Sequence, residues 1–303
     1  MERMEKKVKK LLLPPLFVMA LFPFLSGCSS DQETVAQETS IQEEATEQRI
    51  VATTMSIVEI MDELELDLVG VPMTSSEMPE RYKGVTEVGS AMNPDVEIIK
   101  SLNPTDVLSV TTLEYDLANG FKEVGLPSTF INFQSIADMQ SEIIALGEKY
   151  DREEQAEQLA EKYTAKLQEI QERVKGKESP RVLVLLGIPG SYLVATTESY
   201  VGSLVELVGG TNVIQGQSVE FLASNTEYLH ESNPDIILRL AHGMPEDVVK
   251  MFDEEFKTND VWKHFNAVKN DRVYDLEEPV FGTTANLQAD IALEELANIL
   301  YEE

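Results

Sequence analysis

The sequence predicts an α/β fold of two lobes with parallel sheets, joined by one long helix. In two separate halves of the chain, short apolar runs typical of buried strands alternate with amphipathic stretches typical of helices. An amphipathic stretch at residues 148–178 separates the two halves and contains no glycine or proline before Gly176. A short motif also recurs at equivalent places in both halves, which indicates that the lobes are related.

The chain begins with a segment that should be excluded from the fold. Residues 1–10 are basic, residues 11–25 are apolar, and Leu25-Ser26-Gly27-Cys28 follows, which is typical of an export signal and resembles a bacterial lipobox. The apolar run is shorter than the roughly 20 residues of a spanning helix and contains prolines. We therefore expect residues 1–27 to be a lipoprotein signal peptide. Cys28 would carry more than one acyl chain, palmitate included, because a single chain anchors only marginally.

The composition excludes several functions. The chain carries a formal charge of −30, and removal of five basic and two acidic residues with the signal peptide leaves −33. A nucleic-acid partner is excluded, because phosphate binding needs a basic patch. Cys28 is the only cysteine, so no intramolecular disulfide can form. Residues 28–48 are polar and acidic without an apolar period, and we expect an acidic flexible tether there.

Residues 49–147 form the predicted N-terminal lobe. Its expected strands lie in residues 49–54, 66–72, 105–110 and 128–133, and its expected helices in residues 57–64 and 96–102. Residues 148–178 form the predicted inter-lobe helix, roughly 40 Å long at about 1.5 Å per residue. Its single apolar stripe includes Tyr163 and Ile170 and favours packing along its own lobes over a coiled coil. We expect small domain motion, because such a helix resists hinge closure.

Residues 179–303 form the predicted C-terminal lobe. The expected strands lie in residues 181–187, 191–197, 212–215, 235–240 and 271–276, and the expected helices in residues 203–208, 227–232 and 245–256.

The internal repeat places candidate ligands at the same edge of both sheets. Residues 97–104 and 227–234 share a Glu and an Asn-Pro pair at the same spacing, and an apolar strand follows each. Asn93 with Pro94, and Asn225 with Thr226, lie where helix caps are expected. Ligands of parallel α/β sheets bind beyond the carboxyl ends of the strands, where His242 follows residues 235–240.

Two side chains at these edges suggest a cargo. Met92 lies in the loop before the helix at residues 96–102, on the expected cleft edge of the first lobe. A thioether on one wall and an imidazole on the other suit haem iron and do not suit a hard cation. Methionine is more often core filler, and a histidine at a strand end is more often an ordinary hydrogen-bonding group. Rival thioethers lie nearby at Met73, Met78 and Met244.

The chain from residue 49 onward resembles the solute-binding proteins whose two Rossmann-like lobes are joined by one long helix, the class III periplasmic-binding-protein type. Within that class, VGSAMNPDVEIIKSLNPTDVLSVTTLEYDL, ILRLAHGMPEDV and VFGTTANLQA resemble the haem-receptor lipoproteins of the Gram-positive iron-regulated surface determinant system. The resemblance implies that Met92 and His242 are the two axial ligands of haem b iron. It also implies low-spin, six-coordinate iron. Because neutral imidazole is the ligand form, we expect affinity to fall below about pH 6.

The resemblance also implies the setting of the protein. It would be a monomeric receptor, lipid-anchored on the extracytoplasmic face of the cell membrane and not an enzyme. It would take haem from a surface haem-donor protein and deliver it to an ABC permease for iron acquisition. In this class one glutamate on each lobe docks on permease arginines, and the matching positions are Glu97 and Glu227. Each also suits the first turn of a helix, where the dipole favours a carboxylate.

Further residues are candidates for the haem pocket. Thr53-Thr54-Met55-Ser56 leads into a helix whose N-terminal N–H groups favour carboxylates such as haem propionates, although Thr54 or Ser56 can equally be an ordinary cap. Phe281, Gly282 and Thr283 would line the other lobe. Tyr115 offers a phenol, and a core or rim position is the alternative.

Other functions remain open at this stage. A siderophore or cobalamin receptor of the same class would use arginines and aromatic residues, and the chain has one tryptophan, Trp262. A metal-cation receptor would need several His and carboxylate side chains at one point, whereas His230 and His264 lie on expected helices and neither is placed near His242. No nucleophile elbow, P-loop or H-E-x-x-H motif indicates an enzyme. A structural or adhesive lipoprotein would not need two lobes.

Overall fold

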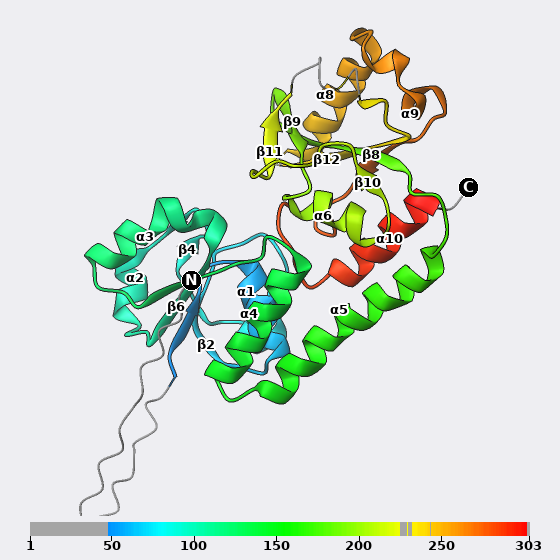
Figure 1. Cartoon of the computed structure of the whole chain (residues 1–303). Coiled ribbons are helices and arrows are strands. Elements are labelled where there is room, and N and C mark those ends of the chain that lie inside the picture. The colour runs from blue at the N-terminus through cyan, green and yellow to red at the C-terminus, as the bar shows by residue number, and fades with distance from the viewer. Residues whose placement is uncertain (1–47, 225–228, 230–231, 243, 302–303) are drawn as a thin grey trace, which may run out of the picture. The chain divides into compact units, whose positions relative to one another are not determined.

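The computed structural model describes residues 48–224, 229, 232–242 and 244–301 (Figure 1). The signal peptide, Cys28, nearly all of the tether, Asn225 with Thr226, Glu227 and His230 therefore lie outside the described residues. The described residues belong to a compact unit that begins at Glu47. Within them, no helix combines the length and the apolar character that a membrane span requires.

The first lobe contains one five-stranded sheet, all of whose strand pairs are parallel, as predicted. Its strand order is β3-β2-β1-β6-β7. The strands are β1 (Ile50–Ala52), β2 (Leu68–Val71), β3 (Thr86–Glu87), β6 (Asp106–Val110) and β7 (Ser128–Ile131). The two central strands β1 and β6 are apolar and almost wholly buried, which is the pattern of a sheet covered on both faces.

Helices cover both faces of this sheet (Figure 1). Helices α1 (Met55–Glu63) and α4 (Ile136–Lys149) pack on one face, where Ile57 and Ile143 join the core. Helices α2 (Val96–Ser101) and α3 (Glu114–Glu123) cover the other face through Ile99 and Phe121. Because the strands are parallel, their carboxyl ends lie along one edge of the sheet, and the hairpin that carries Met92 follows β3 at this edge.

The sheet of the second lobe is mixed, which corrects the prediction of a purely parallel sheet. Its order is β11-β9-β8-β12-β13, and β10 also pairs with β8. Strands β8 (Arg181–Ile188), β10 (Thr211–Asn212), β12 (Ile236–Ala241) and β13 (Val273–Leu276) run parallel, whereas β9 (Ser191–Ala195) and β11 (Phe221–Ala223) are antiparallel additions.

A tight turn explains the antiparallel strand. Ile188 pairs with Ser191, so only Pro189 and Gly190 connect β8 to β9. Gly190 has φ +82°, the value that a type II turn needs at its third residue, and proline suits the position before it. A two-residue connection can join only antiparallel strands.

Helices also cover both faces of the second sheet. Helices α6 (Tyr200–Leu207) and α10 (Ala289–Tyr301) pack on the face that carries Leu238 and Leu240. Helix α8 (Pro245–Thr258) covers the other face with the shorter η3 (Trp262–His264) and α9 (Asn266–Lys269). Trp262 is fully buried in this second core, stacked on Phe256 with ring centroids 4.3 Å apart, and is therefore no ligand-binding aromatic residue.

The long helix α5 spans Glu153–Val174 and is shorter than the predicted residues 148–178. Residues 148 and 149 instead end α4, and Asp151 has φ +57°, a left-handed conformation that interrupts the helix. Its 22 residues make it about 33 Å long. The predicted apolar stripe is confirmed, because Tyr163 and Ile170 are fully buried and Leu167 packs against the core.

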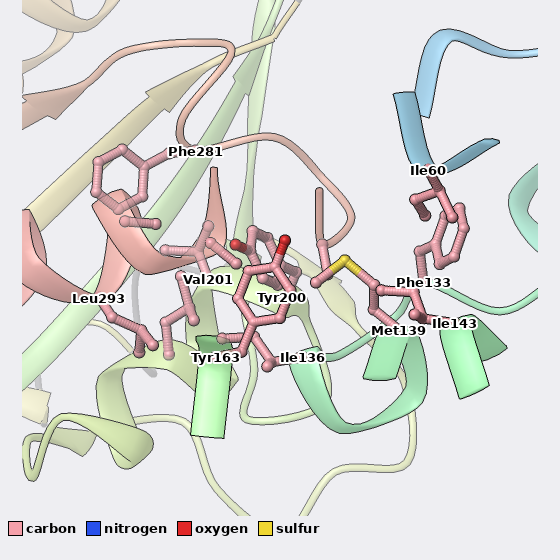
Figure 2. Close-up of a cluster of buried hydrophobic side chains, with 14 of the residues drawn as sticks. Ile60, Phe133, Ile136, Met139, Ile143, Tyr163, Tyr200, Val201, Phe281 and Leu293 are labelled. Atoms are coloured by element: carbon pink, nitrogen blue, oxygen red, sulfur yellow. The ribbon is translucent and has the colours of Figure 1, made fainter. Parts of the chain in front are cut away.

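One hydrophobic core runs from the first sheet, past α5, to the second. Figure 2 shows part of it, with Tyr163 of α5 beside Tyr200 of α6 and Phe133 of the first lobe in the same cluster. Hydrogen bonds also connect the two lobes: Ala285 N donates to Phe133 O at 2.7 Å, and Gln134 Nε2 donates to Glu198 O at 3.1 Å. Separating the lobes would expose this apolar surface, which supports the expectation of small domain motion.

The internal repeat has a structural counterpart. Asn103 and Asn233, which precede the two repeated prolines, have φ +47° and +36°, both in the left-handed region. Asparagine tolerates this conformation better than most residues. In both halves the left-handed residue and the proline after it redirect the chain into a buried strand, β6 or β12.

Candidate functional site

Met92 lies at the tip of a short hairpin. Strands β4 (Gly89–Ser90) and β5 (Asn93–Pro94) are antiparallel and are connected by Ala91 and Met92 alone. The hairpin presents Met92 to solvent, and 69% of the residue is exposed. An exposed thioether of this kind is available to a ligand, whereas a core methionine is not.

Gly89 favours this hairpin, and the structure shows that the helix after it is capped by Asp95 and not by Asn93 as predicted. Gly89 has φ +91°, and a Cβ there would lie 2.9 Å from Asn93 O and from Asp95 N. The helix after the hairpin begins with Asp95 as its N-cap, whose carboxylate accepts from Glu97 N and Ile98 N at 3.0 Å each. Asn93, predicted as the cap, is a strand residue instead, because the hairpin extends to Pro94.

His242 follows β12, as predicted. Its backbone N donates to Gly187 O at 3.0 Å, which continues the ladder between β12 and β8 by one residue. The chain then turns: Met244 has φ +48° and precedes Pro245, the first residue of α8. The imidazole is half exposed, with 50% of its side-chain surface open to solvent.

One nitrogen of the His242 ring is fixed by a carboxylate. Nδ1 lies 2.8 Å from Oε1 of Glu278, which follows β13, the neighbouring strand. With the proton on Nδ1, the imidazole donates this hydrogen bond and leaves the Nε2 lone pair open. This is the arrangement in which a metal-binding histidine is oriented by a second carboxylate and made a better ligand.

Glu278 also affects the charge state of His242. The hydrogen bond from the imidazole to Glu278 raises the pKa of His242 above its ordinary value, against the opposing effect of partial burial. The proton therefore competes for the ring up to a higher pH than at an ordinary histidine.

Sequence reasoning did not single out Glu278. The signal that could have found it is the paired ends of β12 and β13, since His242 follows one strand by one residue and Glu278 follows the other by two. Neighbouring parallel strands bring such positions together.

The rival iron ligands differ in accessibility. Met73 and Met244 are 56% and 61% exposed, whereas Met78 is partly buried against the hydrophobic core. Met73 N donates to Gly89 O at 2.8 Å, so this residue is attached to the hairpin of Met92. Tyr115 is 94% exposed on α3 and makes no core contact, which excludes the core alternative.

The turn before α1 only partly suits a haem carboxylate. Thr53 is buried, and its Oγ1 donates to Leu108 O at 3.1 Å, so it cannot line a pocket. Thr54 is the N-cap residue but makes no side-chain cap bond; its hydroxyl lies 3.1 Å from that of Ser56. The ordinary cap considered from the sequence is therefore wrong for Thr54. Met55 and Ser56 are partly exposed.

Phe281, Gly282 and Thr283, also predicted to line the haem pocket, differ in their exposure. Phe281 is 2% exposed and packs in the core with Val201 and Leu293 (Figure 2), so its ring does not line a pocket. Gly282 and Thr283 after it are partly exposed. The backbone N–H of Phe281 donates to Glu277 O at 3.1 Å.

Two further sequence predictions concern carboxylates and metal ions. Glu97 is exposed in the first turn of α2, as a docking residue would have to be, whereas Glu227 lies outside the described residues. Across residues 48–224, 229, 232–242 and 244–301, no three His, Cys, Asp or Glu side chains gather in a way that would hold a metal ion.

Comparison with known proteins defines the class first. Residues 50–280 match the periplasmic binding protein family, and the chain belongs to this family. The fold of two sheets of the α/β type is shared with the solved structures of its members.

Several proteins share about half of their aligned residues with this chain. The high-affinity heme uptake system protein IsdE of Staphylococcus aureus strain RF122 is 47% identical over 273 residues, 89% of this chain and 94% of its own length. The crystal structure of S. aureus IsdE complexed with heme aligns with a TM-score of 0.79 and 48% identity, covering 84% of this chain and 100% of that one. An ABC transporter substrate-binding protein from Listeria monocytogenes EGD-e aligns with a TM-score of 0.81 and 57% identity, covering 84% and 99%. The family resemblance found in the sequence motifs is thus confirmed.

Proposed function

We propose that this protein is a haem-binding receptor that captures haem b at the cell surface and delivers it to an ABC permease for iron acquisition. The observation that carries the proposal is the His242–Glu278 pair, which orients an imidazole with Nε2 open at the carboxyl end of β12. The similarity to IsdE, which is named for heme uptake and has been solved with heme, supports this cargo.

Met92 and His242 are the proposed axial ligands. Both side chains are exposed: Met92 lies at the tip of the β4–β5 hairpin, and His242 directly follows β12. Thioether and imidazole ligands give low-spin, six-coordinate iron, and no open coordination position is needed for a carrier. Ser56 and the uncapped start of α1, with Gly282 and Thr283 of the second lobe, are the proposed neighbours of the propionates.

The cellular setting is part of the same proposal. Residues 1–27 would be cleaved as a signal peptide, and Cys28 would carry the lipid that holds the receptor on the extracytoplasmic face of the membrane. The domain division proposed for the mature chain is a tether to residue 48, lobes at residues 49–147 and 179–303, and the connecting segment between them. Glu97 and Glu227 would contact the permease, and a surface haem-donor protein would load the monomeric receptor.

A haemin titration of the soluble chain from Ser30 onward tests the function and the ligands together. Wild type, Met92→Ala and His242→Ala are compared by absorbance. We expect a saturable one-to-one Soret shift with low-spin bands in wild type, altered in both variants. A change in His242→Ala alone would move the sixth ligand to Met73, Met78 or Tyr115. Absence of a saturable shift in wild type would refute haem as the cargo and direct the search to siderophores and metal ions.

A further inference from the structure

A groove lies directly beside His242, on the α8 side of the second sheet. It encloses about 670 Å³ between the first turns of α8 and the chain that leaves β13. Ala241, Val249 and Leu276 contribute apolar surface to it. The remaining lining includes Glu246, Asp275, Glu277, Glu278 and Lys250. The groove therefore combines an apolar lining with carboxylates.

Most of this negative charge is not neutralised by the protein itself. Asp275 is already occupied, because it binds Arg239 through two hydrogen bonds of 2.7 Å. Lys250 lines the groove, but its Nζ lies 3.6 Å from Oδ1 of Asp247, a carboxylate outside the groove. Within the part of the chain that the structure describes, Glu246 and Glu277 have no cationic partner.

Glu278 belongs both to the groove and to the iron site. One of its carboxylate oxygens holds His242 Nδ1 at 2.8 Å, and 38% of its side chain is exposed. A cation entering the groove would approach Glu246, Glu277 and Glu278 together. Arginine fits this lining best, because its planar guanidinium binds carboxylates through two parallel hydrogen bonds while its stem and face pack on apolar surface.

We propose that this groove receives an arginine of the transporter's permease, and that the arginine draws Glu278 away from His242 and so promotes haem release. The inference rests on the proposed function. A charged guanidinium is a stronger partner for a carboxylate than a neutral imidazole N–H. Without Glu278, the imidazole becomes a poorer iron ligand. Such weakening serves hand-over to the acceptor and would oppose loading by a donor, which is why the permease is the occupant.

The test measures haem loss from the haem-loaded soluble chain to excess apomyoglobin, with and without hexa-arginine as the probe. We expect hexa-arginine to accelerate haem loss from wild type several-fold. The double variant Glu246→Gln/Glu277→Gln should lose most of this acceleration and keep the basal rate, because neither residue contacts His242. A matched control, Glu153→Gln/Glu154→Gln at the start of α5, removes the same charge far along the chain and should behave as wild type.

Several results would overturn the proposal. Equal acceleration of all three proteins would show unspecific attraction of a polycation to an acidic protein. No acceleration of wild type would show that the groove does not control release. If the groove variant instead slows haem uptake from methaemoglobin and leaves release unchanged, the groove serves a donor. Failure of the proposed function is distinguishable, because wild type would then not take up haem at the first step.

Discussion

Replacement of Glu278 is the most direct perturbation of the proposed iron site. Glu278→Gln keeps the length of the side chain and an oxygen that can accept from His242 Nδ1, and removes only the charge. A hydrogen bond to a charged acceptor is stronger than a neutral one by roughly 1 kcal/mol. Because His242 and Glu278 are 50% and 38% exposed, solvent screening keeps the effect at this low end. We expect haemin affinity to fall about fivefold, and about tenfold or more for Glu278→Ala.

The assay is a haemin titration followed at the Soret band, repeated by competition with apomyoglobin where binding is too tight to titrate. Glu277→Gln is the matched control, since it removes a neighbouring charge without touching His242. The variants should keep low-spin bands, because both axial ligands remain. If Glu278→Gln and Glu278→Ala both bind haemin within twofold of wild type, Glu278 does not support the ligand and the reasoning fails.

Five further predictions address pH, folding and motion. The raised pKa of His242 means that protonation opposes iron binding up to a higher pH than at an ordinary histidine, and haemin titrations between about pH 5 and 9 should place the loss of affinity at lower pH in Glu278→Gln. In the haem-free protein the same raised pKa adds stability that is complete below the unfolded-state pKa and is lost as pH rises through the folded-state pKa, which urea unfolding at several pH values measures. Asp95→Ala removes the cap of α2 and should lower the free energy of unfolding by about 1 kcal/mol in urea titrations; an unchanged value would contradict the cap. Phe281→Ala should cost about 3 to 5 kcal/mol in the same assay while haem bands stay unchanged, whereas altered bands would return Phe281 to the pocket. X-ray scattering should give the same radius of gyration with and without haem, and a clear contraction would refute the shared rigid core.

Much of the fold was readable because each element obeys a local rule. The strands β1, β6, β8 and β12 are continuous apolar runs, and helix α5 shows one apolar stripe at helical spacing. The prediction was wrong where a few residues set the chain direction. Pro189 and Gly190 reverse the chain into β9, and the hairpin at Met92 extends to Pro94, so that Asp95 becomes the cap.

Part of the candidate site could likewise be predicted from the sequence, and part could not. His242 stood out because it follows an apolar strand in a chain with three histidines, whereas Met92 was selected among several methionines by its place before a helix and by the resemblance of its motif to a known family. Glu278 was missed, because 36 residues separate it from His242 and only the pairing of β12 with β13 brings them together. Phe281 was assigned to the pocket together with Gly282 and Thr283, because the sequence does not show toward which side its ring turns.

The sequence by itself determined the α/β class, the long helix and the repeat, because periodicity is a property of short segments. Its motifs singled out the two candidate iron ligands through their resemblance to a known family. Only the tertiary structure decided which nitrogen of His242 is open, which candidates are core and where a groove adjoins the ligand. These features depend on side chains from neighbouring strands and helices, whose distances follow from packing and not from their order along the chain.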